Sequence, residues 1–89
     1  MEWDHRKRKN QRKLQILGVG LDGTEIDSGD LVALLGMSLT NASTCLHDYH
    51  RWGLFTRERR GKTYYYMITG KGVERYWWLL GQNMIRINR

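Results

Sequence analysis

The stretch LGMSLTNASTCLHDYHRWGLF, residues 35–55, decides the fold that the sequence predicts. Ser38 is a favoured residue for capping the start of a helix, and Gly53 suits its end. Between them, apolar residues recur at spacings of three and four, which is typical of an amphipathic helix. The residues expected on its inward face are Ala42, Cys45, Leu46, Tyr49 and Trp52.

The opposite side of this helix is polar and carries no basic residue before Arg51. By helical geometry the outward arc holds Thr40, Ser43, Thr44 and His47, with Asn41 at its margin. These side chains are displayed to something outside the core. The alternative is that they are merely solvated, with Ser38 and Thr40 at the cap.

Two helices are predicted before this one. The first spans about residues 5–17, where strong helix formers dominate, and GVGLDG ends it. The second follows Asp27 or Ser28, either of which can cap its first turn, and it stops at Gly36. Asp30 suits its first turn, because a negative charge is favourable at the positive end of the helix dipole.

After Gly53 the apolar period changes from helical to two, which predicts a β-hairpin. We expect the two strands of LFTRERRGKTYYYMIT to meet at a tight Arg60-Gly61 turn. The residues expected on one face are Tyr64, Tyr66 and Ile68, opposite Phe55 and Arg57.

A last helix is predicted over about residues 71–82, and it is apolar on nearly every side. One stripe holds Val73, Tyr76, Trp77 and Leu80, while Trp78 and Leu79 face another way. Such a helix should pack against its own domain on one side and against a partner on the other. We therefore expect a homodimer with Tyr76, Trp77 and Leu80 at the interface. The alternative is that Trp77 and Trp78 pack back within the monomer.

The order and motifs of these elements resemble the winged helix-turn-helix transcription regulators of the ArsR, MarR and PadR kind. KLQILGVG is similar to their first helix, EIDSGDLVALLGMS to the second helix and turn, LTNASTCLHDYHRWGLF to the recognition helix and TRERRGKTYYYMITGKG to the wing. The likeness covers residues 13–72. It implies an α+β fold, mainly α: a winged helix-turn-helix with a C-terminal helix after the β-hairpin wing. Residues 1–12 would form a basic arm and the start of the first helix, and residues 73–89 a C-terminal helix and tail for dimerisation.

The resemblance also implies a function, the binding of double-stranded DNA by a transcription regulator. The outward arc of the recognition helix would enter the major groove. The residues facing the bases would be Leu39, Thr40, Asn41, Ser43, Thr44 and His47. The basic side chains expected on phosphates or in the minor groove are Arg57, Arg59, Arg60, Lys62, Arg6, Lys7, Arg8 and Lys9. For Arg57 the alternative is that its side chain covers Tyr64.

The charge distribution explains where affinity for a polyanion would arise. The net charge is +6, and residues 1–13 hold six basic groups against two acids. Residues 51–89 hold nine against two, whereas residues 14–50 hold five acids and no Lys or Arg. The attraction would therefore come from the wing and the N-terminal arm.

Two other functions stay open. One is a protein-interaction winged helix that uses the acidic central block and the aromatic last helix. The other is an RNA or single-strand binder that stacks bases on the wing tyrosines, with Tyr65 as the most exposed ring.

Metal and catalytic chemistry have little support. The metal sensors of the family carry Glu-Leu-Cys-Val-Cys-Asp-Leu where residues 25–31 here read Glu-Ile-Asp-Ser-Gly-Asp-Leu, so we expect no metal site and no cofactor. Cys45 and His47 lie roughly 200° apart on a helix, so we expect Cys45 at the core edge and His50 at the surface. No phosphate loop, nucleophile elbow or pair of carboxylates indicates an enzyme. Any small-molecule effector is unknown.

The sequence also bears on location. The lone cysteine indicates no internal disulfide, and the apolar runs are too short to span a bilayer. The N-terminus lacks the apolar segment of a signal peptide. We expect a cytoplasmic protein without a membrane partner.

Overall fold

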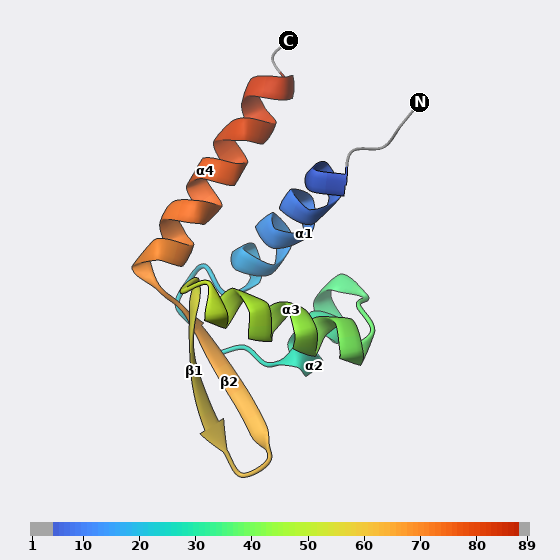
Figure 1. The fold of residues 1–89 in the computed structure, drawn as a ribbon, viewed down its shortest axis with the longest axis vertical. Coiled ribbons are helices and arrows are strands. Elements are labelled where there is room, and N and C mark those ends of the chain that lie inside the picture. Colours follow the sequence, from blue (N-terminus) through green and yellow to red (C-terminus); the bar gives the residue numbers. More distant parts are fainter. Residues whose placement is uncertain (1–4, 88–89) are drawn as a thin grey trace.

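A computed structural model describes residues 5–87 of the chain, and the side chains of residues 8–82 (Figure 1). In that part of the chain the fold is α+β and mainly helical, with four helices and one antiparallel two-stranded hairpin. The elements in order are α1 (His5–Val19), α2 (Ser28–Leu35), α3 (Leu39–Arg51), β1 (Phe55–Arg60), β2 (Thr63–Ile68) and α4 (Gly70–Ile87). The predicted order is confirmed, and α4 continues beyond the expected end at residue 82.

The long helices α1 and α4 lie side by side and run in opposite directions (Figure 1). Their outer ends point away from the hairpin, which forms the opposite end of the molecule. The helix α3 lies between these two parts, next to the hairpin and packed on α2. No helix among the described residues has both the length and the apolar character needed to cross a membrane.

The predicted caps of α2 and α3 are confirmed. The Asp27 side chain accepts a hydrogen bond from the Asp30 amide, and the Asp30 side chain accepts one from the Asp27 amide, each at 2.9 Å. This reciprocal pair satisfies two backbone donors at the start of α2. Gly36 ends α2 with a left-handed φ of 68°. The Ser38 hydroxyl accepts from the Asn41 amide at 3.1 Å and begins α3.

The hairpin turn lies one residue beyond the predicted position, so that prediction was wrong. Arg60 pairs with Thr63, which leaves Gly61 and Lys62 as the two-residue loop. Such a loop needs a positive φ at its first residue, and Gly61 supplies it with a φ of 62°. Arg60 is therefore the last residue of β1. The expected common face is confirmed by the register, and it holds Phe55, Arg57, Tyr64, Tyr66 and Ile68 together with Arg59.

The core gathers side chains from all four helices and from both strands. Its largest fully buried members are Ile16, Leu17, Leu31, Leu46 and Phe55. Trp52 was expected on the inward face of α3 but is 48% exposed. The reason is its position at the C-cap, beyond the last helical turn, where its ring stacks on Tyr49 at 5.6 Å instead of entering the core.

A backbone bridge ties the segment before α2 to the hairpin. Ile26 and Tyr66 exchange two backbone hydrogen bonds, of 2.9 and 2.8 Å. The bridge places residues 25–27 along the free edge of β2. As a result, the start of α2, the hairpin and α3 are held in a fixed relation to one another.

Candidate functional site

The outward arc of α3 is exposed along its whole length. Its centre faces directly away from the buried side chains of Ala42, Leu46 and Tyr49. Leu39, at the first position of the helix, is 61% exposed although it is apolar. The predicted base-facing residues, all exposed, are Leu39, Thr40, Asn41, Ser43, Thr44 and His47. These six side chains are thus available to a partner.

The hairpin lies along one flank of this arc. A groove of about 350 Å³ separates them, lined by Ser43 and His47 from α3 and by Arg57, Lys62 and Tyr64 from the hairpin. A further contact joins the two elements, because His50 Nδ1 lies 3.0 Å from the carbonyl oxygen of Phe55. His50 was expected at the surface, but it is half-buried, because this contact joins α3 to β1.

Arg57 contacts α3 directly. Its Nη1 lies 3.2 Å from His47 Nδ1, and its guanidinium carbon lies 4.5 Å from the ring centroid of Tyr64. The alternative in which Arg57 covers Tyr64 is therefore what the structure shows. Arg59 sits beside the same ring, at 5.8 Å, and its Nε donates to the Gly61 carbonyl at 2.9 Å.

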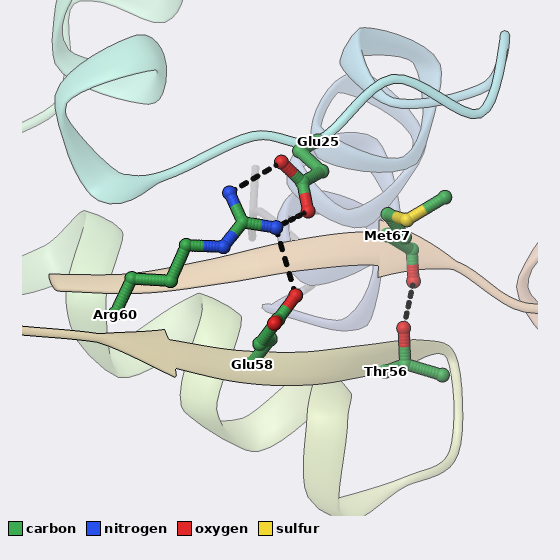
Figure 2. A network of polar contacts seen from close by, with 5 residues as sticks. All are labelled: Glu25, Thr56, Glu58, Arg60 and Met67. Carbon is green, nitrogen blue, oxygen red and sulfur yellow. Dashed lines mark hydrogen bonds and ion pairs between the residues drawn. The ribbon is translucent and has the colours of Figure 1, made fainter.

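Arg60 is bound by two carboxylates (Figure 2). Both of its terminal nitrogens donate to Glu25, and one of them also donates to Glu58 at 2.8 Å. The bonds from Arg60 hold the pKa of Glu25 below its ordinary value. Lys62, in contrast, is exposed at the turn and has no ion pair among the described side chains.

The exposed tyrosine of the hairpin differs from the expected one. Tyr65 was expected to be the most exposed ring, but it is only half exposed because Arg60 lies over it, 4.8 Å from the ring centroid. Tyr64 is the exposed ring, at 40%. Tyr66 is buried in the core.

Basic side chains of α1 border the other flank of the arc. A groove of about 630 Å³ runs between α1 and the C-terminal half of α3. Its basic lining residues are Arg8, Lys9, Arg12 and Lys13. Two further predicted residues, Arg6 and Lys7, have side chains outside the described part. The structure thus places basic groups of the hairpin along the arc, and basic groups of α1 along Cys45, Asp48, Tyr49 and Trp52, beyond the margin of the arc.

Lys13 is the most enclosed of these groups. Its ammonium nitrogen lies 5.0 Å from the ring centroid of Trp52. Burial lowers the pKa of Lys13, and the positive charges of Arg75 and Lys9 lower it further. The ammonium group of Lys13 is therefore partly covered by the protein, and it is less accessible to a partner.

Cys45 lies in the same groove and is half-buried at the edge of the core, as predicted. Burial raises the pKa of its thiol, an effect that Arg12 opposes and Asp48 reinforces. A thiol with a raised pKa is a weak nucleophile at neutral pH. This residue therefore contributes packing rather than reactivity.

The acids of residues 22–30 are engaged in local structure. Asp27 and Asp30 form the capping box of α2. Asp22 accepts from both the amide and the hydroxyl of Thr24, at 3.0 and 2.8 Å, and Glu25 accepts from Arg60. The negative charge of this block is thus used within the chain.

The outward side of α4 presents two tryptophans. Trp77 and Trp78 are 57% and 54% exposed, so they do not pack back within the described part of the monomer. Tyr76 was expected at an interface, but it is half-buried against the core and lies beside Gly18 of α1. Leu80 is also half-buried.

Sequence reasoning missed three basic residues near the arc. Arg51 is exposed and follows Thr40 by eleven residues, which is close to three helical turns, so it lies on the same line of α3. The spacing between Thr40 and Arg51 in the sequence was therefore enough to place Arg51 on the outward side of the helix. Arg12 and Lys13 lie near α3 because α1 lies beside it in the fold. No local sequence pattern predicts this long-range arrangement.

Comparisons of the chain with protein-family models, with curated proteins and with solved structures found no match, so the function must be argued from the site itself.

Proposed function

We propose that this chain is a winged helix-turn-helix protein that binds double-stranded DNA as a homodimer and regulates transcription. In this proposal α3 is the recognition helix and lies in the major groove, and the hairpin is the wing. No catalytic activity, metal or cofactor is part of the proposal.

One observation carries it: an exposed helix face that is polar and uncharged over its first nine residues, with basic side chains on both flanks. Hydroxyl and amide groups can donate to and accept from base edges, and Asn41 suits adenine. Lys62 and Arg59 on one flank, and the α1 groups on the other, suit the phosphates of the two groove walls. Phosphate contacts supply affinity while the uncharged face supplies sequence preference.

The engaged acids favour DNA over a protein partner. A protein-interaction surface built on the acidic central block needs free carboxylates, but Asp22, Glu25, Asp27 and Asp30 are all hydrogen-bonded within the chain. Among these acids and Asp48, only Asp48 lies on α3 itself, towards the basic groove of α1. Within the described part of the chain only Glu25 of these four is paired with a cation, so Asp22, Asp27 and Asp30 keep their charges while their oxygens are engaged by neutral donors.

The covered ring of Tyr65 disfavours the single-strand binder. Base stacking needs aromatic faces open to solvent. Arg60 lies over Tyr65 and Arg57 lies over Tyr64, so the exposed hairpin ring, Tyr64, already has a cation stacked on it.

The proposed dimer uses the exposed tryptophans of α4. Two large rings more than half exposed on one helix are typical of an interface core. Trp77, from the predicted set, is joined by Trp78, while Tyr76 supports the helix from within. Two-fold symmetry would set the recognition helices about 34 Å apart and require a palindromic site.

The test is a titration of the protein against duplex DNA, single-stranded DNA and RNA of matched length, at two salt concentrations. We expect preference for the duplex, with affinity falling steeply as salt rises. Equal binding to single strands would contradict the proposal, and so would binding to none of the three. A selection of bound duplexes from a random pool would then give the sequence preference.

A further inference from the structure

We propose that Arg57 is a positioning residue that acts through His47: it fixes the imidazole tautomer, so that the Nε2–H of His47 reads a guanine. This inference rests on the proposed function for its DNA part. It assigns to Arg57 a role in sequence reading, in place of the phosphate contact expected from the sequence.

The chemistry of the pair determines the tautomer. A guanidinium has five N–H donors and no acceptor, so the contact of Arg57 Nη1 with His47 Nδ1 at 3.2 Å requires Nδ1 to accept. In a neutral imidazole the proton must then be on Nε2. Among the described side chains none accepts from Nε2, so this donor is available to an external acceptor.

The surroundings keep Arg57 in place. Its guanidinium is stacked on Tyr64, at 4.5 Å from the ring centroid, on the face of the hairpin that borders the groove. His47 lies on the exposed arc of α3, on the flank that faces the hairpin. The wing thus controls a group on the recognition helix without touching the base itself.

Guanine is the base that fits a single fixed donor. Its major-groove edge carries two adjacent acceptors, N7 and O6, and no donor. On adenine a donor lies beside N7, cytosine offers only a donor, and thymine offers the single acceptor O4 beside its methyl group, so guanine presents the largest target to one donor. The helix has no arginine or lysine before Arg51, and the hydroxyls and the amide of the arc can both donate and accept, so His47 supplies the fixed donor of the arc.

His50 provides an internal reference for the tautomer. Its Nδ1 lies 3.0 Å from the Phe55 carbonyl, an oxygen that can only accept, so His50 carries its proton on Nδ1. The two histidines of α3 should therefore show opposite tautomers. Proton–nitrogen NMR correlation spectra of the imidazoles, recorded at mildly alkaline pH, distinguish the two tautomers. A His47→Gln variant assigns the signals.

The first arm of the experiment uses the protein without DNA. We expect His47 to be protonated at Nε2 and His50 at Nδ1, and we expect Arg57→Met to give a mixture of tautomers at His47 only. A His47 protonated at Nδ1 in the unaltered protein would overturn the inference. An unchanged His47 spectrum in the Arg57→Met variant would overturn it as well.

The second arm measures base preference with a pool of duplexes randomised at the bound site. Arg59→Met is the matched control, because it removes the same charge from the same face of the hairpin without contact to His47. We expect a guanine preference of about tenfold at one position in the unaltered protein. Arg57→Met should reduce it to about twofold or less, whereas Arg59→Met should weaken all duplexes alike and keep the preference.

The outcomes separate the two proposals. If the unaltered protein binds no duplex, the proposed function fails and the guanine contact with it, whatever the NMR result. If it binds duplexes but Arg57→Met and Arg59→Met change base preference equally, only the positioning role fails. In a His47→Ala background Arg57→Met should change base preference no further, and an additional change would overturn the coupling.

Discussion

Arg60, the last residue of β1, binds Glu25, which precedes it by 35 residues, through both terminal nitrogens of its guanidinium (Figure 2). Bidentate pairs of this kind fix orientation as well as distance. The pair reinforces the backbone bridge between Ile26 and Tyr66, so the wing and the segment before α2 are joined by both backbone and side chains. The hairpin is therefore held against the segment before α2 by contacts of both kinds.

This pair predicts how stability depends on pH. Arg60 lowers the pKa of Glu25 in the folded protein, so the pair stabilises the fold above the ordinary pKa of a glutamate, about 4.3. That contribution to stability is lost as the pH falls through the lowered pKa of Glu25. We expect Glu25→Gln to reduce the thermal midpoint at neutral pH and to match the unaltered protein in strong acid. Thermal unfolding across the acid range measures this, and a constant difference at every pH would contradict it.

The same ion pair predicts how strongly the basic residues of the hairpin, Arg59, Arg60 and Lys62, each contribute to duplex affinity. The charge of Arg60 is balanced by Glu25 and Glu58, whereas Lys62 has no ion pair among the described side chains. We expect Lys62→Ala and Arg59→Ala each to weaken binding to all duplexes and to reduce the slope of affinity against salt by about one unit. Arg60→Ala should change that slope less. Titrations at several salt concentrations measure the slopes, and a larger effect at Arg60 would contradict the ranking.

Asn41 predicts a different kind of effect. Its backbone N–H donates to the hydroxyl of Ser38, the cap of α3. Its exposed side chain makes none of the described hydrogen bonds. Asn41→Ala should therefore leave folding intact and cost about 1–3 kcal/mol of discrimination at one adenine. Competition between duplexes that differ at single positions measures this. A uniform loss for all duplexes, as expected for Lys62→Ala, would contradict base reading by Asn41.

Local signals were sufficient for the order of the elements and for the exposed polar arc of α3. The caps at Asp27 and Ser38 and the period of three and four within α3 are short-range features, because they depend on hydrogen bonds and faces within one or two turns. The outward arc followed from geometry alone. Two local features were misplaced: Gly61 was taken as the second loop residue instead of the first, and Trp52 was placed on the inward face although it lies at the C-cap of α3.

Long-range contacts account for what the sequence could not show. The pairing of Arg60 with Glu25 and the contact of Arg57 with His47 depend on how the hairpin leans against the rest of the fold. Nothing in the pattern of residues 56–63 distinguishes a free arginine from a paired one. The covering of Tyr65 by Arg60 is a consequence of the same packing.

The exposed rings of α4 predict a dimer that depends on them. Trp77→Ala or Trp78→Ala should weaken association by roughly 2 kcal/mol or more, which is about thirtyfold in the dissociation constant. Trp52→Ala is the matched control, because that ring is also about half exposed, at 48%, but lies on α3. Sedimentation equilibrium measures the association. A monomeric unaltered protein, or an equal effect of Trp52→Ala, would contradict the assignment.

Two glycines of α4 predict stability changes of opposite sign. A Cβ at Gly72 would collide with the Leu54 carbonyl, where the start of the helix meets the start of β1. Thr69 fixes this junction by donating its hydroxyl to the Gly53 carbonyl at 2.6 Å and accepting from the Gly72 amide at 3.0 Å.

Gly72→Ala must therefore displace backbone, and we expect a loss of about 1–3 kcal/mol in the free energy of unfolding. Gly81 has nothing within 4 Å of the same position, and alanine is favoured over glycine within a helix by about 1 kcal/mol. Gly81→Ala should accordingly raise the free energy of unfolding by up to that amount. Urea denaturation of both variants measures the two changes in the free energy of unfolding. Equal effects would mean that the close approach of α4 to β1 does not limit residue 72.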